Sequence, residues 1–577
     1  MSELPDAVDV LADLLRARHL LARAVELFAQ AGHRYLADGR PGRAADLLGR
    51  ACRLLELDDF PATEAVRYAE LLDALLTALI QAGRLTHAQH LAERVDELDC
   101  AGLPAATMAG LRTRLAWAAT DAGQHAPAAA QLATARSLLP PPEQLADIDA
   151  IAARLALRAP GADPGALGAR ALDAAADRPE TRCQALDVLG RQARRTGASL
   201  RRERFRELLE VARRHQLGYW SLVAQWQLGI DEWLAEGATQ RLAQVARTAA
   251  HRECAAIGCA ATTLLALDAV LRGCYPAAEG LIRRCQADAD ALGLGGTLDS
   301  LAMIQTVLNG HQGNRERLRM SIAGFRQRGA ADAHLAPLAF ALGGAFCALL
   351  EEDRATALAD LDRVGGRDPL TGQPGIRLLL RALAGRSVVR PTLVPTRWDR
   401  SFALFARAVQ LGRSGHAERA AEVTGAALRA AAPYPLARQL GLRLIAEAAH
   451  RDGWGQPGDW LTEAEEYFHR TGVPAVAAAA RSLLRQWGSP LPQRRDGAED
   501  IPAAVRRQGV TVRECDVLRL LIARPGNRAI AARLHISPRT VEKHMASLLM
   551  KLGQPNREAL RDQAVDLFGS MLDQSAS

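Results

Sequence analysis

A glycine-anchored pattern recurs through the first 487 residues and limits the fold of the chain more than any other feature. In each copy a glycine is followed by a small or apolar residue at +5, an apolar one at +9 and a small or apolar one at +12. Glycine can close one helix, and small residues on the next helix let neighbouring helices approach closely. The copies begin at Gly39, Gly83, Gly123, Gly237 and Gly273, with a partial copy at Gly415.

The spacing of these copies predicts a fold. Adjacent copies lie 44, 40 and 36 residues apart, which is typical of stacked helical hairpins. Aromatic residues make up only 4% of the chain, while alanine, leucine and arginine are abundant, and this composition favours helices over sheets. We therefore expect residues 1–487 to form an all-α solenoid that resembles tetratricopeptide repeats, with looser spacing. Residues 488–504 are rich in proline, glycine and charge, which indicates a linker.

The C-terminal part carries a well-delimited short helix, Ser537 to Leu552. Ser537 is a good N-cap, Pro538 suits the first helical position, and Gly553 suits the stop. Apolar residues from Val541 to Leu552 fall on one face, and the opposite face is mixed and basic. A helix of this kind fits the major groove of DNA.

Three further helices are expected around this one. They span Glu514–Ala523, Arg528–Leu534 with Asn527 as its cap, and a last helix from Asn556 to Phe568. Together the four helices predict a helix-turn-helix with a flanking brace over residues 505–577.

The residues of this segment resemble the LuxR-type DNA-binding domain. The resemblance covers about 50 residues without a gap. It rests on Thr511, Arg513-Glu514, Val517-Leu518, Asn527, Ile530-Ala531, Leu534, Ile536-Ser537, Thr540-Val541, His544, Lys551-Leu552-Gly553, Arg557 and Glu558-Ala559. The order of array, linker and domain looks like the C-terminal part of the large ATP-binding LuxR regulators, without their ATPase module.

We expect the front of the helix that begins at Ser537 to contact DNA. Lys543 is expected at bases or phosphate, Arg539 near the backbone and Thr540 at a phosphate close to the helix N-terminus. The alternative is that Lys543 is only a solvated helix residue. Val541 and His544 are expected to pack. The other DNA-binding candidates are Asn527, Arg528, Ser537, Ser547 and Lys551.

Charge supports this location. The net charge is +7, and residues 505–577 hold 12 basic and 7 acidic residues, so that 12 − 7 = +5 of the excess lies there. The two lysines of the chain are Lys543 and Lys551, so no P-loop lysine precedes residue 543. No metal-ligand or catalytic spacing occurs either. We therefore expect no cofactor, no metal and no enzymatic activity.

Two segments of the array leave alternatives open. Tyr219, Trp226 and Trp233 are seven apart and share a helix face, which favours core packing or, alternatively, the wall of a ligand groove. Residues 190–215 hold nine arginines and three glutamates. They are expected as solvated faces with local pairs such as Glu203–Arg206 and Glu210–Arg214, or as an auxiliary nucleic-acid patch.

The sequence also bears on compartment and redox state. No run of about 18 apolar residues occurs, and the N-terminus is acidic and polar, so neither a membrane span nor a signal peptide is expected. The nine scattered cysteines indicate reduced, buried thiols in a cytoplasmic protein.

These observations favour a sequence-specific transcriptional regulator that binds double-stranded DNA. The helical array would serve as a sensor or partner-docking platform for a protein or small-molecule effector. The last helix carries Leu560, Val565, Leu567 and Phe568, which predicts a homodimer on an inverted-repeat operator. Alternatively, that apolar face packs on the helix at Glu514–Ala523. An alternative function is a helical-repeat adaptor whose C-terminal domain docks on protein instead of DNA.

Overall fold

The computed structural model shows a chain that divides into two compact units, Met1–Trp487 and Gly488–Ser577. No strand occurs in the part of the chain that it describes. The expected linker, 488–504, lies outside the described residues except for 488–489. The described residues are 4–56, 64–99, 103–157, 163–175, 177–193, 197–327, 339–364, 374–386, 396–489, 505, 508–522, 526–534 and 536–572.

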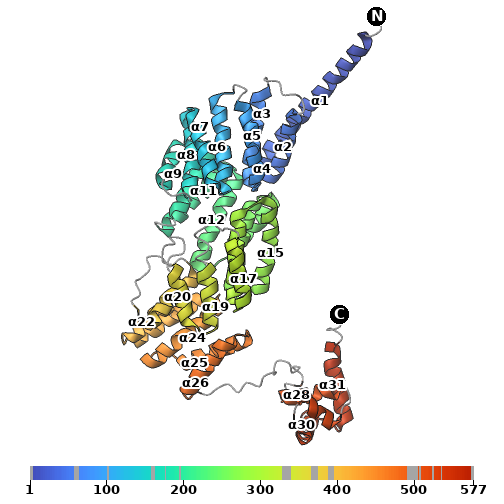
Figure 1. Cartoon of the computed structure of the whole chain (residues 1–577), viewed down its shortest axis with the longest axis vertical. Helices are drawn as coiled ribbons and strands as arrows, with labels where there is room; N and C mark the ends of the chain where they lie inside the picture. Colours follow the sequence, from blue (N-terminus) through green and yellow to red (C-terminus); the bar gives the residue numbers. More distant parts are fainter. Residues whose placement is uncertain are drawn as a thin grey trace. The chain divides into compact units, whose positions relative to one another are not determined.

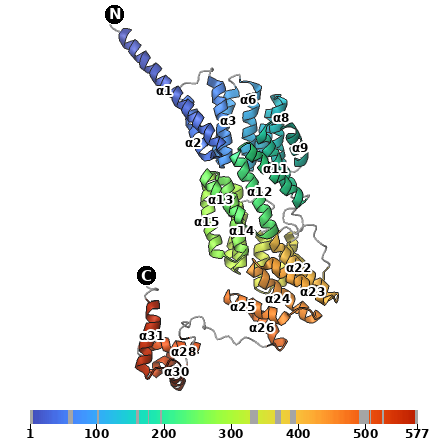
Figure 2. The same ribbon diagram turned by 180° about the vertical axis from the view of Figure 1, so that it is seen from behind.

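The first unit is an array of helices that follow one another as hairpins (Figures 1 and 2). Its first half consists of α1 (Leu4–Ala37), α2 (Pro41–Glu56), α3 (Ala65–Ala82), α4 (Leu85–His90), α5 (Ala92–Asp99), α6 (Ala105–Asp121), α7 (His125–Ser137), α8 (Pro142–Ala156), α9 (Pro164–Ala174), α10 (Pro179–Gln192), α11 (Ala198–Arg214) and α12 (Gly218–Glu236). Its second half consists of α13 (Gln240–Arg252), α14 (Ala255–Leu271), α15 (Tyr275–Leu292), α16 (Gly295–His311), α17 (Arg315–Gln327), the π-helix η3 (Ala339–Gly344), α19 (Ala345–Leu350), α20 (Arg354–Val364), α21 (Gly375–Leu383), α22 (Arg397–Arg413), α23 (Ala417–Ala431), α24 (Pro435–Asp452), α25 (Pro457–Arg470) and α26 (Pro474–Gln486).

The glycine pattern marks the hairpin turns as predicted. All six anchoring glycines have a positive φ, which L side chains rarely adopt. The pattern residues that follow them are mostly buried, for example Ala44, Leu48 and Ala51 after the first glycine. A seventh copy was missed: Gly313 also has a positive φ and is followed by buried Leu318 and Phe325. One helix expected after Gly83 is instead two, α4 and α5, which are interrupted at Leu91.

Parts of the array far apart in sequence also touch. A Cβ on Gly39 would lie 2.9 Å from the Cα of Gly218, so the first hairpin turn and the start of α12 meet backbone to backbone. The Cys254 thiol lies 3.9 Å from the carbonyl oxygen of Gly39. Position 39 therefore requires glycine for two reasons. Its φ of 69° is one that L side chains rarely adopt, and a Cβ would collide with the backbone of Gly218.

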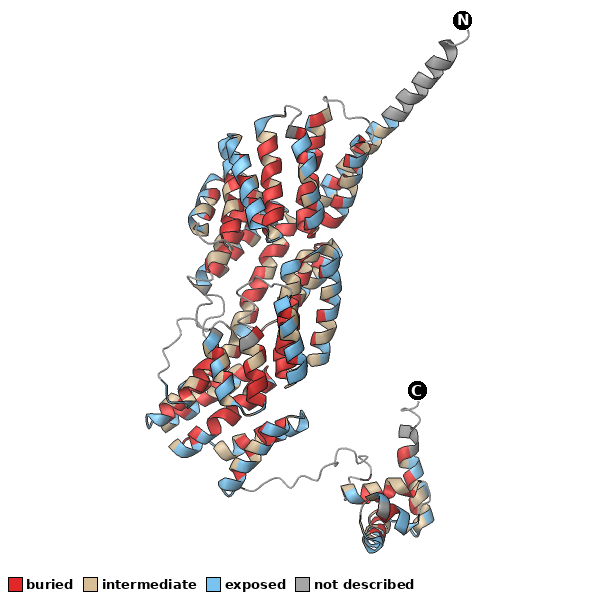
Figure 3. Ribbon diagram, viewed as in Figure 1, coloured by how far each residue is buried: buried red, intermediate tan, exposed pale blue. Residues whose placement is uncertain are grey.

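Helix α12 belongs to both apolar cores of the array (Figure 1). Its first half, with Trp220 and Val223, packs in the N-terminal core, and Ile230 and Trp233 pack in the C-terminal core. Figure 3 shows α12 largely buried between its neighbours. The packing interpretation of the aromatic residues on this helix therefore holds for Tyr219 and Trp233, which are buried, while Trp226 is half-buried.

Four arginines of the arginine-rich segment, Arg191, Arg201, Arg204 and Arg214, form ion pairs within the array. The predicted pair Glu203–Arg206 is not formed among the described residues. The predicted pair Glu210–Arg214 is present at 2.8 Å, and Arg204 contacts Glu207 at 3.1 Å. Arg201 is buried against Asp231. The interpretation as helix faces with local ion pairs therefore holds for these four arginines.

The thiols follow the expectation with one exception. The described cysteines are free, and all are buried apart from Cys274, which is exposed. Burial raises the pKa of the Cys52 thiol to about 12. None of the described helices has both the length and the apolar character that a membrane span requires.

Candidate nucleic-acid interface

The described residues of the second unit form four helices around one apolar core. They are α28 (Val512–Leu521), α29 (Asn527–Leu534), α30 (Pro538–Lys551) and α31 (Arg557–Leu572). The core is formed by buried residues from all four helices, among them Leu518, Ile530, Val541 and Leu560. Helix α30 packs against α28 and α29, and α31 packs against α28. The order helix, helix, turn, helix, brace is the one predicted, although Ala523 and His535 lie outside the described residues.

The ends of α30 are fixed by the expected residues. The Ser537 hydroxyl accepts a hydrogen bond from the Thr540 backbone N–H at 3.1 Å, and Pro538 occupies the first turn. At the other end Gly553 has φ 63°, and the Gln554 N–H donates to the Leu549 carbonyl at 2.9 Å. Hydrogen bonds from nearby residues therefore satisfy backbone groups at both ends of α30.

Helix α30 has one buried and one exposed face. Val541 and Leu548 are fully buried, and Met545 is nearly so. The opposite face exposes Arg539, Glu542, Lys543, Ala546 and Met550, whose exposed fraction is 80%. The prediction that Val541 packs is confirmed, and His544 is half-buried.

The cations on the exposed face are free to meet a ligand. Within the described residues no carboxylate forms an ion pair with Arg539 or Lys543. Arg528, at the start of α29, is also exposed. Thr540 is half-buried, and its hydroxyl lies 2.8 Å from that of Ser537. Two unpaired cations on one helix face suit an anionic partner such as a phosphate backbone.

Ser547 and Lys551 are turned toward the domain itself. Ser547 donates to Glu514 of α28 at 2.6 Å, and the Lys551 ammonium donates to both carboxylate oxygens at 2.9 and 2.7 Å. Glu514 is only 4% exposed and also accepts from the Thr511 backbone N–H at 2.7 Å. Burial raises the pKa of Glu514, but hydrogen bonds from Lys551, Ser547 and Thr511 outweigh it and lower that pKa to about 2.

Residues 508–564 match the family described as bacterial regulatory proteins, luxR family. The second unit therefore contains a LuxR-type helix-turn-helix domain. The chain is also 46% identical over 55 residues to a protein of Mycobacterium tuberculosis (strain ATCC 25618 / H37Rv) that bears the name of an HTH-type transcriptional regulator. That similarity covers 10% of this chain and 6% of the relative.

The eight candidate residues of the LuxR-type domain fall into two groups. Four of them, Ser537, Arg539, Thr540 and Lys543, cluster at the first two turns of α30, and Arg528 lies in the first turn of the neighbouring α29. The other three have partners within the domain. Ser547 and Lys551 hold Glu514, and the Asn527 side-chain oxygen accepts from Arg557 at 2.5 Å. Asn527 was expected to cap α29 but is its first residue, because the first helical N–H, that of Ile530, donates to the Gly526 carbonyl.

Sequence reasoning missed Glu514 as a structural centre. It was recognised only as part of the family resemblance. A local signal was present, because Thr511 followed three residues later by Glu514 is a capping-box pattern, and the structure contains that box. Arg557, which holds Asn527, was missed in the same way.

Proposed function

We propose that this protein is a sequence-specific DNA-binding transcriptional regulator. In this proposal α30 enters the major groove, with Lys543 at bases or phosphate and Arg539 and Thr540 near the backbone. The observation that carries it is the pair of exposed cations on the free face of α30, which have no carboxylate partner among the described residues of the LuxR-type domain. Arg528 at the start of α29 extends the same basic character.

We assign Ser547, Lys551 and Asn527 a different part in this function. They hold α30 and α29 in place, so they act on DNA affinity through the position of those helices. Their contacts with Glu514 and Arg557 support this assignment. Ser537 acts in the same way by capping α30.

Pairing of two LuxR-type domains through α31 is the second part of the proposal. Leu560 and Phe568 are buried in the core of their own domain, so they do not contribute a surface. Val565 is 42% exposed and Leu567 is half-buried, and these two remain for pairing. A two-fold dimer would place two copies of α30 about one helical turn of DNA apart, on an inverted repeat.

The helical array is proposed to act as the regulatory part. It would serve as a sensor or docking platform and restrain DNA binding until an effector binds. An effector shifts this balance only by its difference in affinity for the two states. The alternative is that the array assists binding through dimer contacts. The fragment Val505–Ser577 and the full chain, titrated on one operator at fixed salt, separate the two, because restraint predicts tighter binding by the fragment.

The experiment that tests the proposed function is selection of bound sequences by the full chain from a pool of random DNA duplexes. We expect enrichment of one inverted-repeat sequence. Recovery of sequences without a shared motif would refute sequence-specific recognition. The adaptor alternative predicts that no duplex is retained even at low salt.

A further inference from the structure

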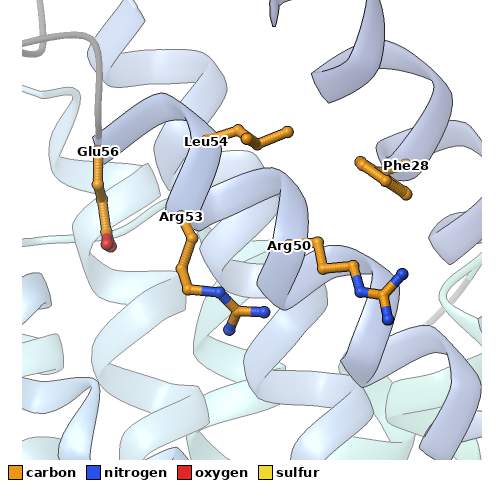
Figure 4. A pocket seen from close by; sticks show the side chains of 5 residues that line it. All are labelled: Phe28, Arg50, Arg53, Leu54 and Glu56. Carbon is orange, nitrogen blue, oxygen red and sulfur yellow. The ribbon is translucent and has the colours of Figure 1, made fainter.

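A pocket lies at the first hairpin of the array, between α1 and α2. Its volume is about 490 Å³, and its lining residues are Phe28 on α1 and Arg50, Arg53, Leu54 and Glu56 on α2. Figure 4 shows the Leu54 side chain pointing toward Phe28, with the Arg50 guanidinium beside them. The pocket is therefore apolar on one side and basic on the other.

Helix α1 also exposes apolar side chains outside the pocket. Phe28 and Leu54 are half-buried, while Leu20 and Leu27 have exposed fractions of 69% and 53%. Large exposed apolar side chains mark a surface that is suited to contact with another molecule.

The basic side of the pocket consists of Arg50 and Arg53. Arg50 and Arg53 are both exposed, and no carboxylate among the described residues pairs with either. Glu56 is engaged elsewhere, because the Tyr68 hydroxyl donates to it at 2.5 Å and Arg94 lies 3.8 Å from it. The Arg50 guanidinium lies 6.0 Å from the centre of the Phe28 ring, which orients the cation over the apolar side.

A second hollow in the array shows which features are specific to the first. It is lined by Arg206, Leu209, Glu210, Arg213 and Arg214. Here Glu210 neutralises Arg214, and Leu209 is the only apolar lining residue. The second hollow therefore has arginines but only one apolar side chain. Removal of two arginines there is a charge-matched control for removal of two arginines from the first pocket.

We propose that the pocket between α1 and α2 docks an acidic amphipathic helix of a protein partner. An apolar side chain of the partner enters between Phe28 and Leu54, and carboxylates one turn away pair with Arg50 and Arg53. The spacing of three residues between the two arginines places them on one face of α2, in reach of carboxylates on a single helix. This inference rests on the docking role proposed above for the array and names the chemistry of the partner.

The test uses the full chain and a short synthetic helical peptide with leucines on one face and glutamates on the other. The labelled peptide is titrated with protein in the absence of DNA, and fluorescence anisotropy reports binding. We expect saturable binding that weakens with salt, and loss of about tenfold in affinity in the Arg50→Ala/Arg53→Ala double variant. The charge-matched Arg206→Ala/Arg213→Ala variant is expected to bind like the wild type.

A charge swap makes the test specific. An Arg50→Glu/Arg53→Glu variant should lose the glutamate peptide and gain a peptide in which lysines replace the glutamates. A peptide with serines in place of the leucines should bind neither protein.

Several results would overturn the proposal. These are no saturable binding, equal loss in both alanine double variants, or equal binding of the serine peptide. Displacement of the labelled peptide by random duplex DNA as effectively as by unlabelled peptide would assign the arginines to nucleic acid instead. Self-association of the wild type that Arg50→Ala/Arg53→Ala abolishes would make a second copy of the chain the occupant. None of these measurements depends on DNA binding by α30. A negative result would therefore reject the docking proposal and not the proposed regulator function.

Discussion

Lys551 in the last turn of α30 donates hydrogen bonds to both carboxylate oxygens of Glu514 on α28, at 2.9 and 2.7 Å. The same carboxylate accepts from Ser547, one turn earlier on α30. A single buried acid therefore fixes the helix that is proposed to enter the major groove. This relationship separates residues that position α30 from residues on its free face.

Replacing Glu514 should destabilise the LuxR-type domain. Glu514→Gln removes the charge that Lys551 faces, and the expected loss of unfolding free energy at neutral pH is about 3 kcal/mol. Urea unfolding of the unit Gly488–Ser577, followed by far-UV circular dichroism, measures it. Glu558→Gln, an exposed change on α31, is the control and should leave stability unchanged.

The effect of Glu514 should depend on pH in one direction. Its pKa in the folded domain, about 2, lies below the ordinary value, so the folded state binds fewer protons. Its contribution is complete above pH about 4.5 and is lost as pH falls toward about 2. The stabilities of wild type and Glu514→Gln should therefore converge over that interval. A constant difference between them would contradict the assignment.

Substitutions of the two lysines of the chain should affect different properties, operator affinity for Lys543 and domain stability for Lys551. Lys543→Ala should cost about 1–3 kcal/mol in operator binding without loss of stability, because Lys543 is exposed. Lys551→Ala should lower the stability of the domain, because it leaves the buried carboxylate of Glu514 unpaired. Mobility-shift titration and urea unfolding of both variants separate the two effects. Unchanged operator affinity in Lys543→Ala would show that Lys543 is only a solvated helix residue.

Charge at the exposed position on α31 should block pairing. Val565→Asp places a carboxylate where two domains are proposed to meet, whereas Glu558→Gln on the same helix should have no effect. Sedimentation of the full chain should show a dimer that the Val565→Asp change converts to monomer. Footprinting of the wild type should protect two half-sites. A single protected half-site would reject the two-fold arrangement.

His311 should make the array sensitive to acid. It is 2% exposed, stacks near Phe346 at 4.7 Å and Trp398 at 5.6 Å, and neither ring nitrogen has a hydrogen-bond partner among the described residues. Burial lowers its pKa to about 3, so only the unfolded state is protonated in mildly acid solution. Stability should fall by about 1.4 kcal/mol for each pH unit from about 6.5 toward 3.

Variants of two histidines test the acid sensitivity. The thermal midpoint of the array, followed between pH 7 and pH 5 by tryptophan fluorescence, should fall less in His311→Phe than in the wild type. His416→Gln changes an exposed histidine and should reproduce the wild-type dependence. An identical pH dependence in all three proteins would show that His311 is not the titrating group.

Local sequence signals were sufficient to predict the helices of the LuxR-type domain. Ser537, Pro538 and Gly553 each act through neighbours within four residues, so the limits of α30 are encoded nearby. The orientation of Ser547 and Lys551 is different. Their place on the mixed face of α30 made them DNA candidates, but their partner Glu514 lies 33 and 37 residues away. The periodicity of one helix does not specify such a partner.

The array shows the same division between local and long-range information. Its hairpin turns follow from glycines with positive φ, which act locally. The approach of Gly39 to Gly218 and the enclosure of His311 by Phe346 and Trp398 depend on how successive hairpins stack. The pocket at Phe28 and Leu54 arises from the pairing of α1 with α2. It could not be read from either helix alone.

The most direct measurement of the central claim is the affinity of the full chain for its selected operator over a range of salt concentrations. Wild type is compared with Arg539→Ala/Lys543→Ala and with the charge-matched array variant Arg206→Ala/Arg213→Ala. Recognition through α30 predicts weaker binding only in the first variant, with the slope of log affinity against log salt reduced by up to about 2. Equal affinities in all three proteins, or equal affinity for a scrambled duplex, would contradict it.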